Sequence, residues 1–139
     1  QYLAAAETII RRAIHPCVPP GRHELLDAER RWSYTVFLQS LLKFHNVFQY
    51  VPDACPVRDY VLASLNTYGS WMVNNEAYYL DQPDTLEFPT ETWAAQELRK
   101  GMVLLMIARF AMGASRNQMV QRGRDILDRA WQYSSFCSF

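Results

Sequence analysis

The sequence predicts an all-α protein in which about five main helices form antiparallel hairpins. Over long stretches, apolar residues recur at intervals of three and four, which places them on one face of a helix. No stretch shows the strict alternation of apolar and polar residues that indicates a strand. The chain has 139 residues, of which 50% are hydrophobic. We therefore expect residues 1–139 to form a single helical domain with a sizeable core.

The charge balance narrows the classes of partner. Lys and Arg together number 14, Asp and Glu also number 14, and the formal net charge is zero. Nucleic-acid and membrane-surface proteins usually carry a basic excess, so we predict neither partner. No signal peptide or apolar run of membrane-spanning length is visible. Because the chain starts at Gln1 without a Met, we expect a piece of a longer protein.

The cysteines indicate a reducing compartment. Cys17, Cys55 and Cys137 are too few and too scattered for a disulfide scaffold. This favours an intracellular, cytoplasmic setting. His15 and His23 flank Cys17, but their spacing matches no standard zinc pattern and a fourth ligand is missing. We predict no metal and no cofactor.

The first two helices are predicted over residues 2–14 and 23–48. The first has a narrow apolar stripe and ends before a stretch rich in Pro and Gly. The second opens with the charged stretch HELLDAERR and continues with large apolar groups. We therefore expect its later part to be buried. The stripe consists of Trp32, Val36, Phe37, Leu41, Phe44 and Phe48.

The third helix is predicted from Val57 to Asn74, with Pro56 in the first turn, where its missing N–H is not needed. Its apolar residues form one face, so it should be buried on one side only. Residues 75–89 contain two prolines and show no clear period. A connection of that length in a compact domain is often functional.

The fourth helix is predicted over residues 90–112, with Thr90 or Thr92 as its cap. The only charged residue between Met102 and Met112 is Arg109. An apolar run of this kind indicates a helix buried on nearly every side. Arg109 should then pair with a carboxylate or reach past the edge of the core.

A turn at Gly113 and Ala114 separates this run from the fifth helix. Ser115 and Gln118 have the spacing of a capping box, which predicts that the fifth helix starts at Ser115. Its apolar residues again lie on one face.

Buried and one-sided helices thus alternate, and long polar connections lead into the buried ones. The stretches ERRWSYTVFLQ (29–39) and YLDQPDTLEFPTETWAAQELRK (79–100) resemble segments of large uncharacterised bacterial proteins of the α/α-toroid kind. This architecture is used by many glycoside hydrolases and polysaccharide lyases. The chain is too short to close a ring of hairpins, so the resemblance implies an incomplete toroid.

The resemblance implies a carbohydrate cleft where the inner helices begin. Glycoside hydrolysis usually needs two carboxylates, and Glu29 and Glu91 are the catalytic candidates. Aromatic rings could stack on a sugar while polar groups bond its hydroxyls. The predicted substrate-binding residues are Arg30, Arg31, Trp32, Tyr34, Tyr79, Glu87, Thr92, Trp93, Gln96 and Arg99.

A second hypothesis is a non-catalytic helical interaction or scaffold domain. Glutamates at a helix start stabilise the helix dipole without any catalytic role. Arg30 or Arg31 would then form a salt bridge with Glu91 between two helices. The partner would be the remainder of a longer chain or a second copy, in place of a glycan. Unsatisfied apolar surface would also predict self-association.

Overall fold

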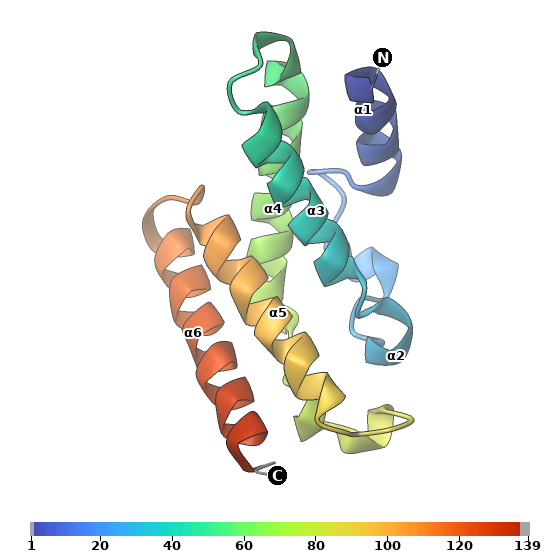
Figure 1. The fold of residues 1–139 in the computed structure, drawn as a ribbon, viewed down its shortest axis with the longest axis vertical. Helices are drawn as coiled ribbons and strands as arrows, with labels where there is room; N and C mark the ends of the chain where they lie inside the picture. The colour runs from blue at the N-terminus through green and yellow to red at the C-terminus, as the bar shows by residue number, and fades with distance from the viewer. Residues whose placement is uncertain (1, 137–139) are drawn as a thin grey trace.

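The computed structural model describes residues 2–136 and confirms an all-α fold, with no strand among them (Figure 1). Four short 3-10 turns lie in the connections, at Pro20–His23, Pro52–Ala54, Tyr79–Asp81 (η3) and Pro83–Thr85. The α-helices are α1 (Tyr2–Ala13), α2 (Ala28–Arg31), α3 (Tyr34–Phe48), α4 (Cys55–Asn75), α5 (Thr92–Ala108) and α6 (Gly113–Phe136).

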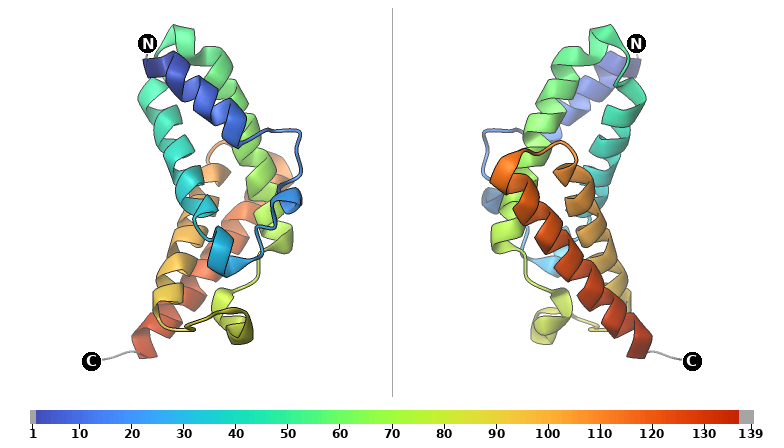
Figure 2. Two further views of the ribbon diagram at one scale, coloured as in Figure 1. Left: turned by 90° about the vertical axis from the view of Figure 1, so that its right-hand side faces the viewer. Right: turned by 90° about the vertical axis from the view of Figure 1, so that its left-hand side faces the viewer.

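Two antiparallel hairpins, α3–α4 and α5–α6, form the body of the protein (Figures 1 and 2). Helix α3 packs beside α5, and α4 packs beside α6, so the hairpins stack on each other. Helix α5 contacts the other three long helices. Stacked hairpins occur in closed toroids and in open helical repeats alike. The toroid and its incomplete ring therefore stay predictions.

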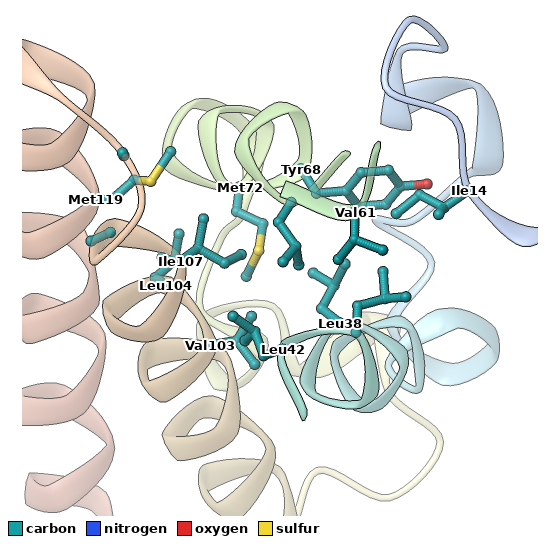
Figure 3. Packing of buried hydrophobic residues seen from close by; sticks show 14 of the residues in the cluster. Ile14, Leu38, Leu42, Val61, Tyr68, Met72, Val103, Leu104, Ile107 and Met119 are labelled. Atoms are coloured by element: carbon teal, nitrogen blue, oxygen red, sulfur yellow. The ribbon is translucent and has the colours of Figure 1, made fainter. Parts of the chain in front are cut away.

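The core lies between the two hairpins (Figure 3). Leu38, Val61, Met72, Leu104 and Ile107 come from three helices, and each is 0% exposed. Burying a side chain of this size stabilises the fold by about 1.5–3 kcal/mol. Helix α1 closes the side of the α3–α4 hairpin with buried Ile10, and Ile14, directly after the helix, is buried as well.

Helices α5 and α6 approach each other closely because each has a glycine at the crossing. A Cβ placed on Gly101 would lie 2.9 Å from the backbone oxygen of Gly123 and 2.8 Å from Cγ of Leu127. Real Cβ atoms do not tolerate such contacts, so the missing side chains permit this approach.

The predicted helix 23–48 is wrong as a single element. The chain forms a 3-10 turn, then α2, and begins α3 only at Tyr34. Glu24 has a φ of 52°, which lies outside the helical region. The Asp27 side chain accepts a bond from the backbone N–H of Arg30 (3.3 Å), so it caps α2 and stops any earlier helix from running through.

Helix α3 is also less buried than predicted. Its buried residues are Thr35, Leu38, Leu41 and Leu42. Val36 is 38% exposed and Val47 is 71% exposed, so α3 is one-sided, like α4. The apolar groups on its outer side contact no other described part of the chain closely enough to be buried.

The ends of the fourth and fifth helices need correction. Helix α5 starts at Thr92 and ends at Ala108, and neither predicted threonine caps it, because Glu91 occupies that position. The predicted extension of this helix to residue 112 is wrong, because the chain turns after Ala108. Met112 is 85% exposed. Arg109 reaches solvent. Helix α6 starts at Gly113, two residues before the predicted start.

The other predicted elements are confirmed. Helix α1 matches the first prediction closely, and α4 carries Pro56 in its first turn. Residues 76–91 hold only 3-10 turns and irregular chain. Within residues 2–136, no helix combines the length and the apolar character that crossing a membrane requires.

Candidate functional site

A pocket of about 280 Å³ lies where α2 meets the start of α5. We call it the α2–α5 pocket. Residues 88 and 90 of the preceding connection complete its wall. Its lining residues are Glu29, Trp32, Phe88, Thr90, Thr92, Trp93 and Gln96. Five predicted site residues are therefore brought together here: Glu29, Trp32, Thr92, Trp93 and Gln96.

A small second core supports this pocket. Ala28, Tyr79, Leu86 and Trp93 are buried together, apart from the main core, and Trp32 packs against them. The rings of Tyr79 and Trp93 meet edge to face, with centroids 5.1 Å apart. The indole N–H of Trp93 donates to the carbonyl oxygen of Phe88 (3.1 Å). These contacts hold the connection against α5 and fix the two indoles of the pocket.

Glu29 supplies a carboxylate to the pocket. Its Oε1 accepts a bond from the backbone N–H of Glu87 (2.7 Å). Glu87 itself is exposed and contributes this backbone donor. No ion pair involves Glu29 within residues 2–136. Carboxylate acceptor capacity thus stays open toward the pocket.

Arg99 and Gln96 lie beside the pocket on α5. The Arg99 guanidinium lies 5.7 Å from the centroid of the Trp32 ring and donates to the Gln96 side chain. A guanidinium at that distance from an indole face is attracted to the ring. The pair therefore orients Trp32 and Gln96 at the pocket edge.

The second catalytic candidate, Glu91, lies elsewhere. It lines a separate pocket of about 330 Å³ with Leu80, Pro89 and Tyr133. Only Thr90 belongs to both pockets. The structure thus places Glu29 and Glu91 in different depressions.

The two neighbouring arginines do not reach Glu91. Arg30 is exposed, and its Nε lies 3.6 Å from Oδ2 of Asp27. Arg31 is exposed as well. In the described part of the chain, no ion pair joins either arginine to Glu91. Arg30 lines a third depression, of about 460 Å³, beside Trp71.

Tyr34 and Tyr79 belong to a buried polar group that the sequence did not predict. We call Tyr34, Glu76, Tyr79, Glu97 and Lys100 the Lys100 cluster. Lys100 is 0% exposed. Its Nζ lies 2.9 Å from Oε2 of Glu76 and 3.3 Å from Oε1 of Glu97. It also donates to the carbonyl oxygen of residue 77 (2.7 Å) and lies 3.6 Å from the centroid of the Tyr79 ring.

Hydrogen bonds tie the remaining members together. The Tyr34 hydroxyl donates to Oε1 of Glu76, and the backbone N–H of Tyr79 donates to Oε1 of Glu97. Oε2 of Glu97 is buried and has no hydrogen-bond partner in the described structure. Burial raises the pKa of the Glu97 carboxyl, although Lys100 acts in the opposite direction. Burial also raises the pKa of the Tyr34 and Tyr79 hydroxyls.

A periodic signal for part of this cluster was present in the sequence. Trp93, Glu97, Lys100, Leu104 and Ile107 follow intervals of four and three, so they share one face of α5. The two charged residues interrupt an apolar stripe, which points to a buried ion pair. Glu76 directly follows the C-terminal end of α4, and no local pattern indicates its contact with Lys100.

Comparison of the chain with protein-family models, curated proteins and solved structures finds no match. Among the described residues, no group of three or more His, Cys, Asp or Glu side chains is placed to hold a metal ion. The site is therefore interpreted from its own chemistry: a carboxylate, an amide and hydroxyls beside two indole rings.

Proposed function

We propose that the α2–α5 pocket binds a glycan. The observation that carries this proposal is the pairing of two indoles, Trp32 and Trp93, with a carboxylate, Glu29, that forms no ion pair in the described structure. A ligand pocket typically combines aromatic walls with a few well-placed polar groups. A sugar ring offers the matching surfaces, with C–H groups on its faces and hydroxyls around its rim.

The polar groups of the pocket suit hydroxyls. Glu29 accepts hydrogen bonds, Gln96 has an amide, and Thr92 has a hydroxyl that both donates and accepts. Phe88 is 69% exposed at the pocket, so it offers a further apolar surface to a ligand.

The proposal concerns binding and assigns no catalytic pair. Both classes of glycosidase place two carboxyl groups on either side of one scissile bond. Glu29 and Glu91 line separate depressions that share Thr90, so a ligand confined to the α2–α5 pocket would contact Glu29. In an α/α toroid, further hairpins could add a second carboxylate, and the proposed role of this chain there is to provide one wall of the cleft.

The alternative function, a helical interaction domain, is favoured by a depression with both apolar and polar walls. This depression, of about 420 Å³, lies between α3 and α5, and its lining residues are Val36, Leu42, Met106, Gln39, Ser40, Lys43 and Asn46. Met102, also on α5, is 46% exposed. Under this proposal the partner is another helical hairpin, from the rest of a longer chain or from a second copy. Concentration-dependent self-association, measured by analytical ultracentrifugation, would support it.

Titration calorimetry against a panel of neutral and acidic oligosaccharides tests glycan binding. We expect Trp32→Ala to weaken binding about tenfold or more, which corresponds to about 1.4 kcal/mol. Glu29→Gln should also weaken glycan binding, because the substitution replaces a charged acceptor with a neutral amide. Tyr50→Ala is the matched control, since Tyr50 is 87% exposed and lies in the turn between α3 and α4. Binding that Trp32→Ala leaves intact would contradict the proposal.

A further inference from the structure

The Lys100 cluster has an uneven count of buried charges. Glu76 is 5% exposed and Glu97 is 3% exposed, whereas Lys100 is the only cation paired with either carboxylate in residues 2–136. With both carboxylates ionised, the cluster would carry a net negative charge away from water. Such an uncompensated buried charge is costly, and proteins commonly neutralise it by binding a proton.

Among the described residues, no second cation forms an ion pair with the carboxylate oxygens of the cluster. Burial raises the pKa of the Tyr34 and Tyr79 hydroxyls, so these two members of the cluster are neutral. Arg122 of α6 donates to the backbone oxygen of Glu76 (2.5 Å) and contacts the Tyr78 hydroxyl (3.4 Å). Arg99 on α5 is engaged with Gln96 and lies over the Trp32 ring.

The hydrogen bonds indicate which carboxyl takes the proton. Both oxygens of Glu76 are engaged, Oε1 by Tyr34 and Oε2 by Lys100. In Glu97, Oε1 receives the bonds from the Tyr79 N–H and from Lys100, and Oε2 receives none. A proton on Oε2 would leave every existing bond in place and remove the excess negative charge of the cluster.

We infer that Glu97 is a proton-operated latch for residues 76–91: with Oε2 protonated the cluster is neutral and holds this connection on α5, and loss of that proton loosens it. The connection is tied to the latch directly, because the Tyr79 N–H donates to Glu97. Ala77 is tied through its carbonyl oxygen, which accepts from Lys100.

The direction of the pH effect follows from linkage. Burial raises the pKa of Glu97 in the folded protein above that of an unfolded chain. A group of this kind contributes its full stability below the unfolded pKa, and that contribution is lost as the pH rises through the folded pKa. The latch is therefore closed in acid and weakened as the pH rises.

A consequence for the ligand rests on the proposed function. Tyr79 packs on Trp93, which lines the α2–α5 pocket, and the latched connection supplies Phe88 and Thr90 to the same pocket. Opening of the latch should disturb this wall. Glycan affinity should then fall as Glu97 ionises, and Glu97→Gln should remove this pH dependence.

Carbon-13 NMR of the glutamate Cδ atoms tests the latch without any ligand. The Cδ resonance of Glu97 can be assigned in the wild-type protein by through-bond correlations. We expect the midpoint of its pH titration to lie above the ordinary glutamate value of about 4.3. Over the same pH range, amide hydrogen exchange of Tyr79 should rise faster than the intrinsic rate. In Glu97→Gln this excess should vanish, whereas the exposed variant Glu91→Gln should retain it.

Two results would overturn the inference: titration of Glu97 at or below the ordinary value, or Tyr79 exchange that follows the intrinsic rate through the Glu97 midpoint. The test also separates the two proposals. A raised midpoint with excess Tyr79 exchange supports the latch even if no oligosaccharide binds, in which case only the glycan function fails.

Discussion

At the scale of single residues, Lys100 is fully buried, with 0% of its surface exposed. Its ammonium donates to the Ala77 carbonyl oxygen and to Glu97, and it forms an ion pair with Glu76. These contacts make the burial tolerable, because hydrogen bonds and a counter-charge replace water around the ammonium. The same arrangement makes the cluster sensitive to the loss of any member.

Replacing Lys100 with Met should destabilise the protein by about 3–5 kcal/mol, because buried Glu76 loses its counter-charge and Glu97 loses a hydrogen-bond donor. Urea unfolding followed by circular dichroism measures the change. Lys43→Met is the matched control, since Lys43 is exposed on α3, and it should stay within about 0.5 kcal/mol of wild type. Equal effects of the two substitutions would show that the buried pairing has no special weight.

Tyr34→Phe removes only the hydroxyl that donates to Glu76. A hydrogen bond to a charged group contributes about 1.5–3 kcal/mol, so we expect a loss of unfolding free energy in that range. Tyr50→Phe, at a ring that is 87% exposed, should be nearly neutral. A neutral Tyr34→Phe variant would argue against the bond to Glu76.

At the scale of elements, α5 organises the fold because its first half contacts the second core and its second half contacts the main core. Its first half carries Trp93, Glu97 and Lys100 toward the second core and the Lys100 cluster, and its second half joins the main core. Gly101 lies between them and permits the close crossing with α6. The position of α6 along α5 is therefore set by glycines.

Gly101→Ala should destabilise the protein more than Gly69→Ala. At Gly101 the new Cβ would meet the Gly123 backbone at 2.9 Å, and backbone cannot move aside. At Gly69 the nearest atom, 2.9 Å away, is the flexible end of Met119. Overpacking costs about 1–3 kcal/mol, while alanine gains up to about 1 kcal/mol of helix propensity.

Thermal unfolding of the two variants gives the comparison directly, because both glycines lie inside helices and share the same propensity gain. If Gly69→Ala proved the more harmful, the α5–α6 crossing would be looser than the structure indicates.

The sequence predicted most of the helices and few of the side-chain contacts between them. Helices α1 and α4 follow from periodicity, because each has a continuous apolar face. The stretch 23–48 misled because its apolar stripe is continuous, while the break depends on one cap, Asp27, and on the left-handed Glu24. A single side-chain bond is invisible to a pattern of hydrophobicity.

The candidate site was predicted only in part, because the sequence pattern indicates helix starts and does not show which side chains meet there. Glu29, Trp32 and Trp93 were expected near helix starts, and the fold brings them into one pocket. Glu91 is next to Thr92 in sequence, yet it lines a different pocket, because adjacent side chains near a helix start point about 100° apart.

At the scale of the whole molecule, the buried charge count links global stability to pH. Glu97 has a raised pKa in the folded state, so its contribution favours folding in acid and is lost as the pH rises. We expect the unfolding free energy of wild type, relative to Glu97→Gln, to decline from pH 4 toward neutral pH. Urea unfolding of both proteins at several pH values measures this difference, and a constant difference would contradict it.

The central claim is that the α2–α5 pocket receives a glycan. The four tryptophans allow a direct test, because Trp32 and Trp93 line the pocket, Trp71 lines another depression and Trp131 lies on α6. Proton–nitrogen NMR of the indole N–H groups should be recorded during oligosaccharide titration. The account predicts saturable shifts of Trp32 and Trp93 that exceed those of Trp71 and Trp131. Saturable shifts confined to Trp71 or Trp131, or none with any member of the panel, would contradict it.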